Sequence, residues 1–211
     1  MRVCVKAKMN LSGRELLDTI ASEIVVCTKC GLHKSRKKAV PGEGSPHSQI
    51  MFIGEGPGRS ENAEGRPFVG QAGKFLDTLI SDIGLVREQT FICNVVRCRP
   101  PRNREPRPDE VETCTPYLER QINAIQPRVI VTLGKCSTAH IFSKINLPFN
   151  SITQAHGKAL DRTILGMQVT VFPTFHPAAA LYSVKYKEQL AEDFRVLKSE
   201  LFEKGLVTGS S

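Results

Sequence analysis

The chain has 211 residues, enough for one domain with a substantial hydrophobic core. Hydrophobic residues make up 40% of it and charged residues 24%, which is typical of a soluble globular protein. The net charge of +8 favours a polyanionic partner, nucleic acid first. No segment approaches the ~20 apolar residues of a membrane span, and MRVCVKAKMN lacks the apolar centre of a signal peptide. We therefore expect a cytoplasmic protein without a membrane partner.

The first predicted elements are a helix and a buried strand. Residues 1–10 are expected to form a loose arm. Ser12 and Glu15 fit a capping box at the start of a helix that runs to about Val26. A buried strand is expected over 49–53, where it stops at the glycine-rich sequence GEGPG.

The remaining elements alternate between helices and strands. In chain order they are a helix over 71–83, a strand over 90–96, a helix over 109–125, a strand over 129–133, a short helix ending at 141, a strand over 169–172 and a helix over 186–203. This alternation predicts an α/β fold, a three-layer α/β/α arrangement with a central, mostly parallel four-stranded sheet. We expect a single domain over 1–211, with a loose tail at 206–211.

The residues suited to chemistry lie at the ends of predicted strands. GEGPG follows the first strand, Asn94 lies in the second half of the second strand, and His176 follows the fourth. Ligands of open α/β sheets bind outside the carboxyl ends of the strands. These distant segments are therefore expected to converge on one cleft.

The seven cysteines suggest a metal site rather than a disulfide framework, because their number is odd and no export signal is present. Cys27 and Cys30 form a C-x2-C pair, and Cys98 and Cys114 form a wider one with 15 residues between them. The first spacing suits zinc or an iron–sulfur cluster and also occurs in redox motifs.

The other three cysteines have no such spacing: Cys4, Cys93 and Cys136. We expect Cys93 and Cys136 to be small buried apolar side chains.

Two basic segments adjoin the paired cysteines. HKSRKK follows Cys30, and RPPRNREPRP follows Cys98. The second segment and the residue before its cysteine carry five arginines: Arg97, Arg99, Arg102, Arg104 and Arg107. Prolines stiffen this loop and lower the cost of ordering it. Two such loops tethered to one centre would form a phosphate-contacting surface.

Five motifs occur in order along the chain: CTKC, AVPGEG, GEGPGRSENAEGRPFVGQAGK, NVVRCRPPRNREP and FPTFHPAAAL. With the four paired cysteines they cover 27–201, and the sequence resembles the family 4 uracil-DNA glycosylases, the iron–sulfur type common in thermophilic bacteria and archaea. The resemblance implies a monofunctional repair enzyme that flips uracil out of DNA and hydrolyses its N-glycosidic bond, leaving an abasic site. Uracil-containing DNA is the implied partner. We expect a monomer, and a sliding clamp is left open as a further partner.

The resemblance also implies a cofactor, a 4Fe–4S cluster that orders the basic loops and takes no redox part in the main reaction. Its implied ligands are the four paired cysteines: Cys27, Cys30, Cys98 and Cys114.

Single residues receive roles from the same resemblance. Phe68 is similar to the stacking phenylalanine of the family, Asn94 to the asparagine that reads uracil, and His176 to the donor to uracil O2. Leu181 is the candidate wedge for the vacated base stack. The expected phosphate contacts are Arg99, Arg102 and Arg104.

The water-activating carboxylate is less clear from the motifs. Related glycosylases with a GQDPY motif place an aspartate where this chain has Gly56. Glu55 and Glu61 remain as candidates, and we assign Glu61 to the water or the sugar cation and Glu55 to support of the pocket. Gly54, Gly56 and Gly58 would let the backbone approach the base closely.

Other functions explain less of the sequence. A KRRIH-containing insertion marks relatives that trap uracil covalently, and no such string occurs here. A non-catalytic iron–sulfur module that binds nucleic acid explains the charge and the cysteines, but not Asn94, His176 and GEGPG together. A redox protein has no need of two arginine-rich loops. A nucleotide-binding enzyme would need G-x-x-x-x-G-K-[ST], which this chain lacks.

Overall fold

A six-stranded sheet forms the centre of the computed structural model, which describes residues 12–208. The strand order is β1-β3-β2-β4-β6-β5. Four strands run parallel: β2 (Ile50–Gly54), β3 (Phe91–Asn94), β4 (Val129–Leu133) and β6 (Met167–Thr174). They correspond to the four predicted strands, so the expectation of a mostly parallel sheet is confirmed.

The expected count of four strands is wrong, because each edge carries an additional antiparallel strand. At one edge β1 (Glu43–Gly44) pairs with β3, and at the other β5 (Leu160–Ile164) pairs with β6. The two residues of β1 are too few to show a pattern. The sequence of β5, LDRTI, alternates between half-buried and exposed positions, since an edge strand needs no continuous apolar run.

Seven α-helices surround the sheet in the described part of the chain: α1 (Gly13–Val26), α2 (Arg59–Glu64), α3 (Gln71–Asp82), α4 (Pro108–Ile125), α5 (Lys135–Lys144), α6 (Ile152–Ala155) and α7 (Val184–Glu203). Four short 3-10 helices join them: η1 (Gly31–Lys34), η2 (Arg87–Gln89), η3 (Pro101–Asn103) and η4 (Pro177–Leu181). The capping box of Ser12 and Glu15 is present at the start of α1. The two shortest α-helices, α2 and α6, were not predicted.

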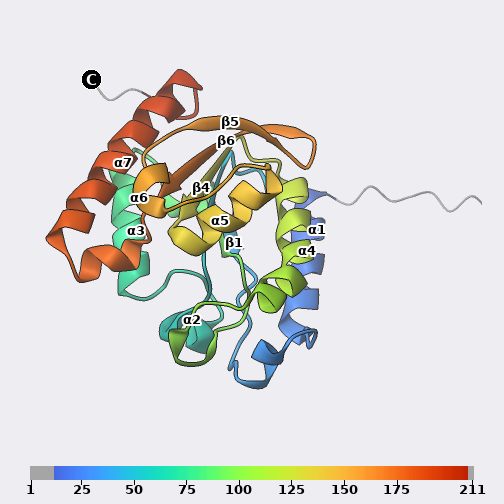
Figure 1. The fold of residues 1–211 in the computed structure, drawn as a ribbon. Helices are drawn as coiled ribbons and strands as arrows, with labels where there is room; N and C mark the ends of the chain where they lie inside the picture. Colours follow the sequence, from blue (N-terminus) through green and yellow to red (C-terminus); the bar gives the residue numbers. More distant parts are fainter. Residues whose placement is uncertain (1–11, 209–211) are drawn as a thin grey trace, which may run out of the picture.

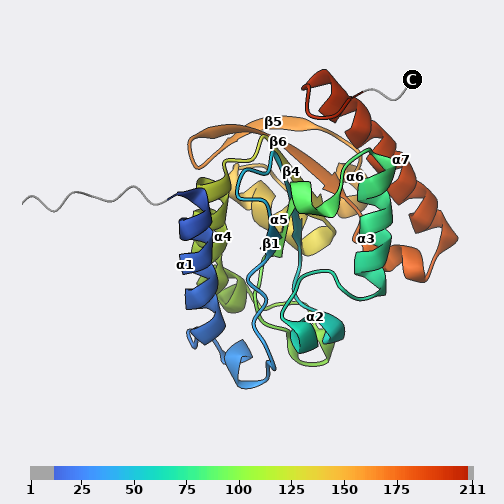
Figure 2. The ribbon, with the colours of Figure 1, turned by 180° about the vertical axis from the view of Figure 1, so that it is seen from behind.

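The helices form two layers, one on each face of the sheet. Helices α1, α4 and α5 cover one face, and α3 and α7 cover the other (Figures 1 and 2). Strand β2 shows the reason, because Met51 and Ile53 enter the first apolar cluster while Ile50 and Phe52 enter the second. A strand buried on both faces needs helices on both sides. The predicted three-layer α/β/α fold is therefore confirmed.

The ends of the chain differ in part from expectation. Leu206 and Val207, expected in a loose tail, pack against the second apolar cluster. The expected arm over 1–10, with Cys4, and residues 209–211 lie outside the described residues. In the described part of the chain, no helix has the length and apolar character needed to cross a membrane.

Candidate active site

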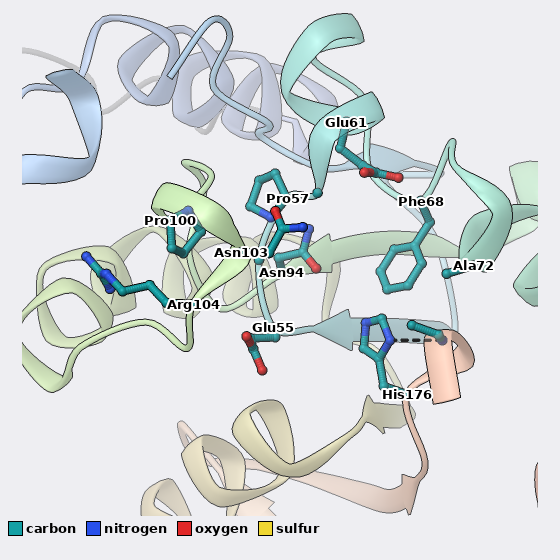
Figure 3. A pocket seen from close by; sticks show the side chains of 13 residues that line it. Glu55, Pro57, Glu61, Phe68, Ala72, Asn94, Pro100, Asn103, Arg104 and His176 are labelled. Atoms are coloured by element: carbon teal, nitrogen blue, oxygen red, sulfur yellow. Dashed lines mark hydrogen bonds between the residues drawn. The ribbon is translucent and has the colours of Figure 1, made fainter. Parts of the chain in front are cut away.

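The carboxyl ends of three parallel strands meet at one cavity of about 310 Å³. Glu55 follows β2, Asn94 ends β3, and His176 follows β6 (Figure 3). The cavity wall consists of Glu55, Gly56, Pro57, Gly58, Glu61, Phe68, Ala72, Asn94, Pro100, Asn103, Arg104, His176 and Ala178. The structure thus brings together the strand-end residues that the sequence predicted to converge.

Phe68 forms a fixed wall of the cavity, in the loop between α2 and α3. Its backbone lies in the left-handed region with φ of 49°, and its side chain is buried. Gly73 permits this conformation, because a Cβ there would lie only 1.9 Å from the Phe68 carbonyl oxygen. The ring stacks on His176, with 5.6 Å between the ring centroids.

Arg87 holds the Phe68 loop from behind and was not singled out in the sequence. Its guanidinium donates to the carbonyl oxygens of Pro67 (2.5 Å) and Phe68 (3.3 Å). It also forms ion pairs with Glu43 (2.9 Å) and Asp77 (2.6 Å). No local motif links these partners, because they lie between 10 and 44 residues from Arg87 in the chain.

Asn94 is a buried amide with an unused acceptor. Its side chain is 2% exposed, and its Oδ1 has no hydrogen-bond partner. A buried polar atom without a partner is costly, so an unpaired one beside a cavity indicates a ligand position. Gly54 keeps this space open, because a Cβ there would lie 2.5 Å from Asn94 Oδ1 and 2.7 Å from Phe68 Cζ.

His176 is held as a neutral donor. Its Nδ1 accepts a hydrogen bond from the backbone N–H of Ala178 at 3.1 Å (Figure 3). Burial lowers the pKa of the imidazole to about 4, although the charge of Glu61 acts in the opposite direction. A neutral ring that accepts at Nδ1 carries its proton on Nε2. At pH 7 the ring therefore offers one N–H donor, Nε2–H.

The two candidate carboxylates have different surroundings. Glu61 Oε1 accepts hydrogen bonds from the backbone N–H groups of Val69 and Gly70, each at 2.9 Å. The half-buried Glu55 has no hydrogen-bond partner among the described residues. Burial, followed by the charge of Glu105, raises the pKa of Glu55.

The four paired cysteines line a second cavity, between α1, η1, the loop after β3 and α4. None of the four forms a disulfide, and all of them line this cavity: Cys27, Cys30, Cys98 and Cys114. No group of three or more His, Cys, Asp or Glu side chains in the described residues is placed to hold a single metal ion. Four cysteine side chains around one cavity are a donor set that occurs in both zinc and iron–sulfur sites.

The two unpaired cysteines within the described residues do not line that cavity. Cys93 is fully buried in β3, as expected. Cys136 lies at the start of α5 and is only half-buried, which differs from the expected burial.

The basic loop between Cys98 and α4 contains arginines of two kinds. Arg104 donates to both carboxylate oxygens of the buried Glu110, at 2.8 and 2.6 Å, and these bonds are the main reason why the pKa of Glu110 is lowered to about 2. Arg102 is exposed, and Arg99 is half-buried and bonded to Asn103 at 2.7 Å. Arg104 is therefore already ion-paired within the protein. Leu181, at the end of η4, is 41% exposed.

Comparison of the sequence with known proteins identifies the family to which this chain belongs. A family model described as the Uracil DNA glycosylase superfamily matches residues 41–198, the span that holds the whole pocket. The chain is 53% identical to the type-4 uracil-DNA glycosylase of Saccharolobus solfataricus, over 89% of this chain and 88% of that protein. Identity is 52% to the same-named protein of Sulfurisphaera tokodaii, over 86% and 83% of the two chains. It is 46% to that of Archaeoglobus fulgidus, over 86% and 91%. The chain belongs to the type-4 uracil-DNA glycosylase family.

Proposed function

We propose that this chain excises uracil from DNA, the activity that names its type-4 relatives, and that the cavity at the strand ends is its uracil pocket. The observation that carries the proposal is the meeting of three groups in one cavity. They are the ring of Phe68, the unpaired amide oxygen of Asn94 and the neutral His176 donor. Chemistry on a base inside a duplex requires the base to be flipped into such a pocket.

Base selection depends on Asn94. Uracil N3–H donates to Oδ1, which has no partner in the protein, and the side-chain N–H donates to uracil O4. Cytosine presents an acceptor at N3 and a donor at N4, so it meets the amide with both polarities reversed. The flipped base stacks on the ring of Phe68. This ring is held by its contact with His176 and by the hydrogen bond from Arg87 to the Phe68 carbonyl oxygen.

Departure of the base depends on His176. Negative charge grows on uracil O2 as the glycosidic bond breaks, and Nε2–H stabilises it by donating a hydrogen bond. The hydrogen bond from Ala178 to Nδ1 sets the tautomer. A neutral donor suffices for this task, because the pocket positions it before the charge develops.

We assign to Glu55 the task of orienting the attacking water or stabilising the sugar cation. The sequence analysis assigns this task to Glu61, so the two glutamates exchange roles. The carboxylate of Glu61 already accepts from Val69 and Gly70 and so positions the segment beside Phe68. Glu55 lies on the pocket wall without an internal partner, so it is available to orient water or to stabilise the oxocarbenium-like sugar.

The cavity between α1 and α4 is assigned to a 4Fe–4S cluster with Cys27, Cys30, Cys98 and Cys114 as ligands. Arg36 supports the fit, because it donates to Cys98 Sγ at 3.2 Å and to the Cys27 carbonyl at 2.7 Å. When bound, the cluster supplies a cross-link between segments far apart in the chain. A cross-link there stabilises the loop that carries Arg99 and Arg102, our proposed phosphate contacts, while Leu181 enters the vacated stack.

The test is release of free uracil from a synthetic duplex with one uracil, alongside an identical duplex with cytosine at that position. We expect the wild-type protein to release uracil and no cytosine, and Asn94→Asp to lose most uracil release. Asn123→Asp, at an exposed position of α4, is the matched control and should behave as wild type. No uracil release by folded wild-type protein would contradict the function. Unchanged release by Asn94→Asp would contradict only the reading role.

A further inference from the structure

Arg97 is an unusually isolated buried charge. Its side chain is 1% exposed, and two of its three guanidinium nitrogens, Nε and Nη1, have no hydrogen-bond partner. The third, Nη2, donates to Gln121 Oε1 at 2.6 Å, which is a neutral partner. Arginine stays protonated in proteins, so this position holds a full positive charge without a paired carboxylate.

The surroundings of Arg97 show where a compensating charge belongs. Arg97 lines the same cavity as the four paired cysteines and immediately precedes Cys98. Burial raises the pKa of the Cys114 thiol to about 11, and Arg97 opposes this effect through its backbone N–H and its charge. Arg97 also opposes the effect of burial on the pKa of Cys93, which does not line the cavity. Among the described residues no ion pair joins Arg97 to an aspartate or glutamate. A buried charge without a counter-charge is strongly unfavourable, and an anionic group bound in the cavity that Arg97 lines would supply that counter-charge.

We propose that Arg97 is the internal counter-charge of the cluster: a permanently charged guanidinium, sealed in the core, that stabilises the anionic thiolate-bound group and favours its more reduced state. This inference rests on the cluster proposed above. It assigns Arg97 a different task from the neighbouring arginines of the loop, which face solvent or pair with Glu110. Arg97 is thus a positioning and tuning residue without contact to DNA.

Two variants separate charge from packing. Arg97→Met removes the charge and keeps much of the side-chain volume. Gln121→Glu keeps Arg97 in place and sets a carboxylate where the amide oxygen now accepts, which cancels the charge. Arg120→Met is the matched control. Arg120 precedes Gln121 in α4, but it pairs with Glu23 at the surface.

The experiment uses the full-length, iron-loaded protein and measures two quantities. One is the half-time of loss of the visible absorption in the presence of a chelator, and the other is the midpoint potential of the cluster. Both Arg97→Met and Gln121→Glu should lose the cluster about 10–100-fold faster, the range typical of outer-shell substitutions at metal sites. Both should also lower the midpoint potential, and Arg120→Met should change neither.

The outcomes distinguish this inference from the proposed function. A wild-type protein without iron or visible absorption would contradict the cluster itself. A loaded wild-type protein whose potential is unchanged in both variants would overturn only the role of Arg97, since a purely structural residue affects retention without moving the potential. If Arg97→Met does not fold, Gln121→Glu decides the question alone.

Discussion

The rings of Phe68 and His176 stack on each other with 5.6 Å between centroids and 27° between planes, although 108 positions separate them in the chain. The ring on which we propose that the base stacks and the group that we propose stabilises its departure therefore hold each other in place. Substitutions at the two positions should not be additive, because each removes a contact that orients the other.

The first prediction concerns catalysis by His176. Its Nε2–H contact strengthens only as charge develops on the departing base, so its loss affects turnover more than binding. His176→Ala should lower the single-turnover rate by roughly 10²–10³, the usual effect of losing one such donor. DNA affinity should change little, and His176→Asn should recover part of the rate because an amide still donates. A destabilised His176→Ala protein with a near-normal rate per folded molecule would refute the catalytic role.

The second prediction concerns acid stability and follows from the pKa of His176, which is lowered to about 4 in the folded protein. Unfolded histidine titrates near ~6.5. Between these values the unfolded chain binds more protons than the folded one, so stability falls as the pH falls. Wild-type melting temperature should therefore decrease relative to His176→Asn from about pH 6.5 down to about pH 4, and the difference should be constant above pH 7. A constant difference down to pH 4 would mean that His176 is protonated in the fold.

The third prediction separates two arginines of the basic loop by their salt dependence. Arg102 is exposed, and Arg104 is paired with the buried Glu110. Arg102→Ala should weaken binding to uracil-containing and normal DNA alike, and should reduce the slope of log affinity against log salt by about 0.9. Arg104→Ala should lower the melting temperature and change that slope less. Equal slopes for wild type and Arg102→Ala would exclude a phosphate contact.

The fourth prediction separates the two glutamates of the pocket. Glu61→Ala leaves the N–H groups of Val69 and Gly70 without their acceptor, which should cost about 1–3 kcal/mol of stability. Glu61→Gln retains an amide oxygen and should restore most of the loss. Glu55→Gln should keep the wild-type melting temperature and lower the cleavage rate. Normal cleavage by Glu55→Gln, with loss of cleavage in a stable Glu61→Gln protein, would show that Glu61 and not Glu55 orients the water.

The fifth prediction concerns the cluster ligands. Cys98→Ala and Cys114→Ala should lose iron and stability together, because a bound metal contributes to the free energy of folding. Cys136→Ala should retain its iron, since Cys136 does not line the cavity. Cys4→Ala should also retain it. Iron analysis and thermal melting on the same preparations test this, and iron loss from Cys4→Ala with full retention by Cys98→Ala would reverse the assignment.

Local patterns predicted most of the fold. The helix expected over 109–125 is α4 (Pro108–Ile125), and the strand expected over 129–133 is β4 (Val129–Leu133), because apolar period and turn residues agree there. Strand β5 was not predicted, because it forms by pairing with β6 and its own side chains show no clear strand pattern.

Motifs also predicted which residues meet in the pocket, but not how their hydrogen bonds are distributed. The sequence does not decide between Glu55 and Glu61 for the water, because both glutamates lie in or near GEGPG. That Glu61 accepts from Val69 and Gly70 depends on the path of the chain between them. The roles of Arg87, Arg97 and Arg104 likewise depend on partners that only the folded chain brings near.

The bracing of the Phe68 loop by Arg87 and Glu61 has a consequence for how damage is found. A pocket whose wall is anchored by ion pairs and backbone hydrogen bonds keeps its shape between encounters with DNA. The pocket then needs little conformational change when it binds a base. The conformational step of the search lies instead in the duplex, whose base pairs must open. Bases that leave the stack most readily are thus presented to the pocket first, before any of its groups has touched them.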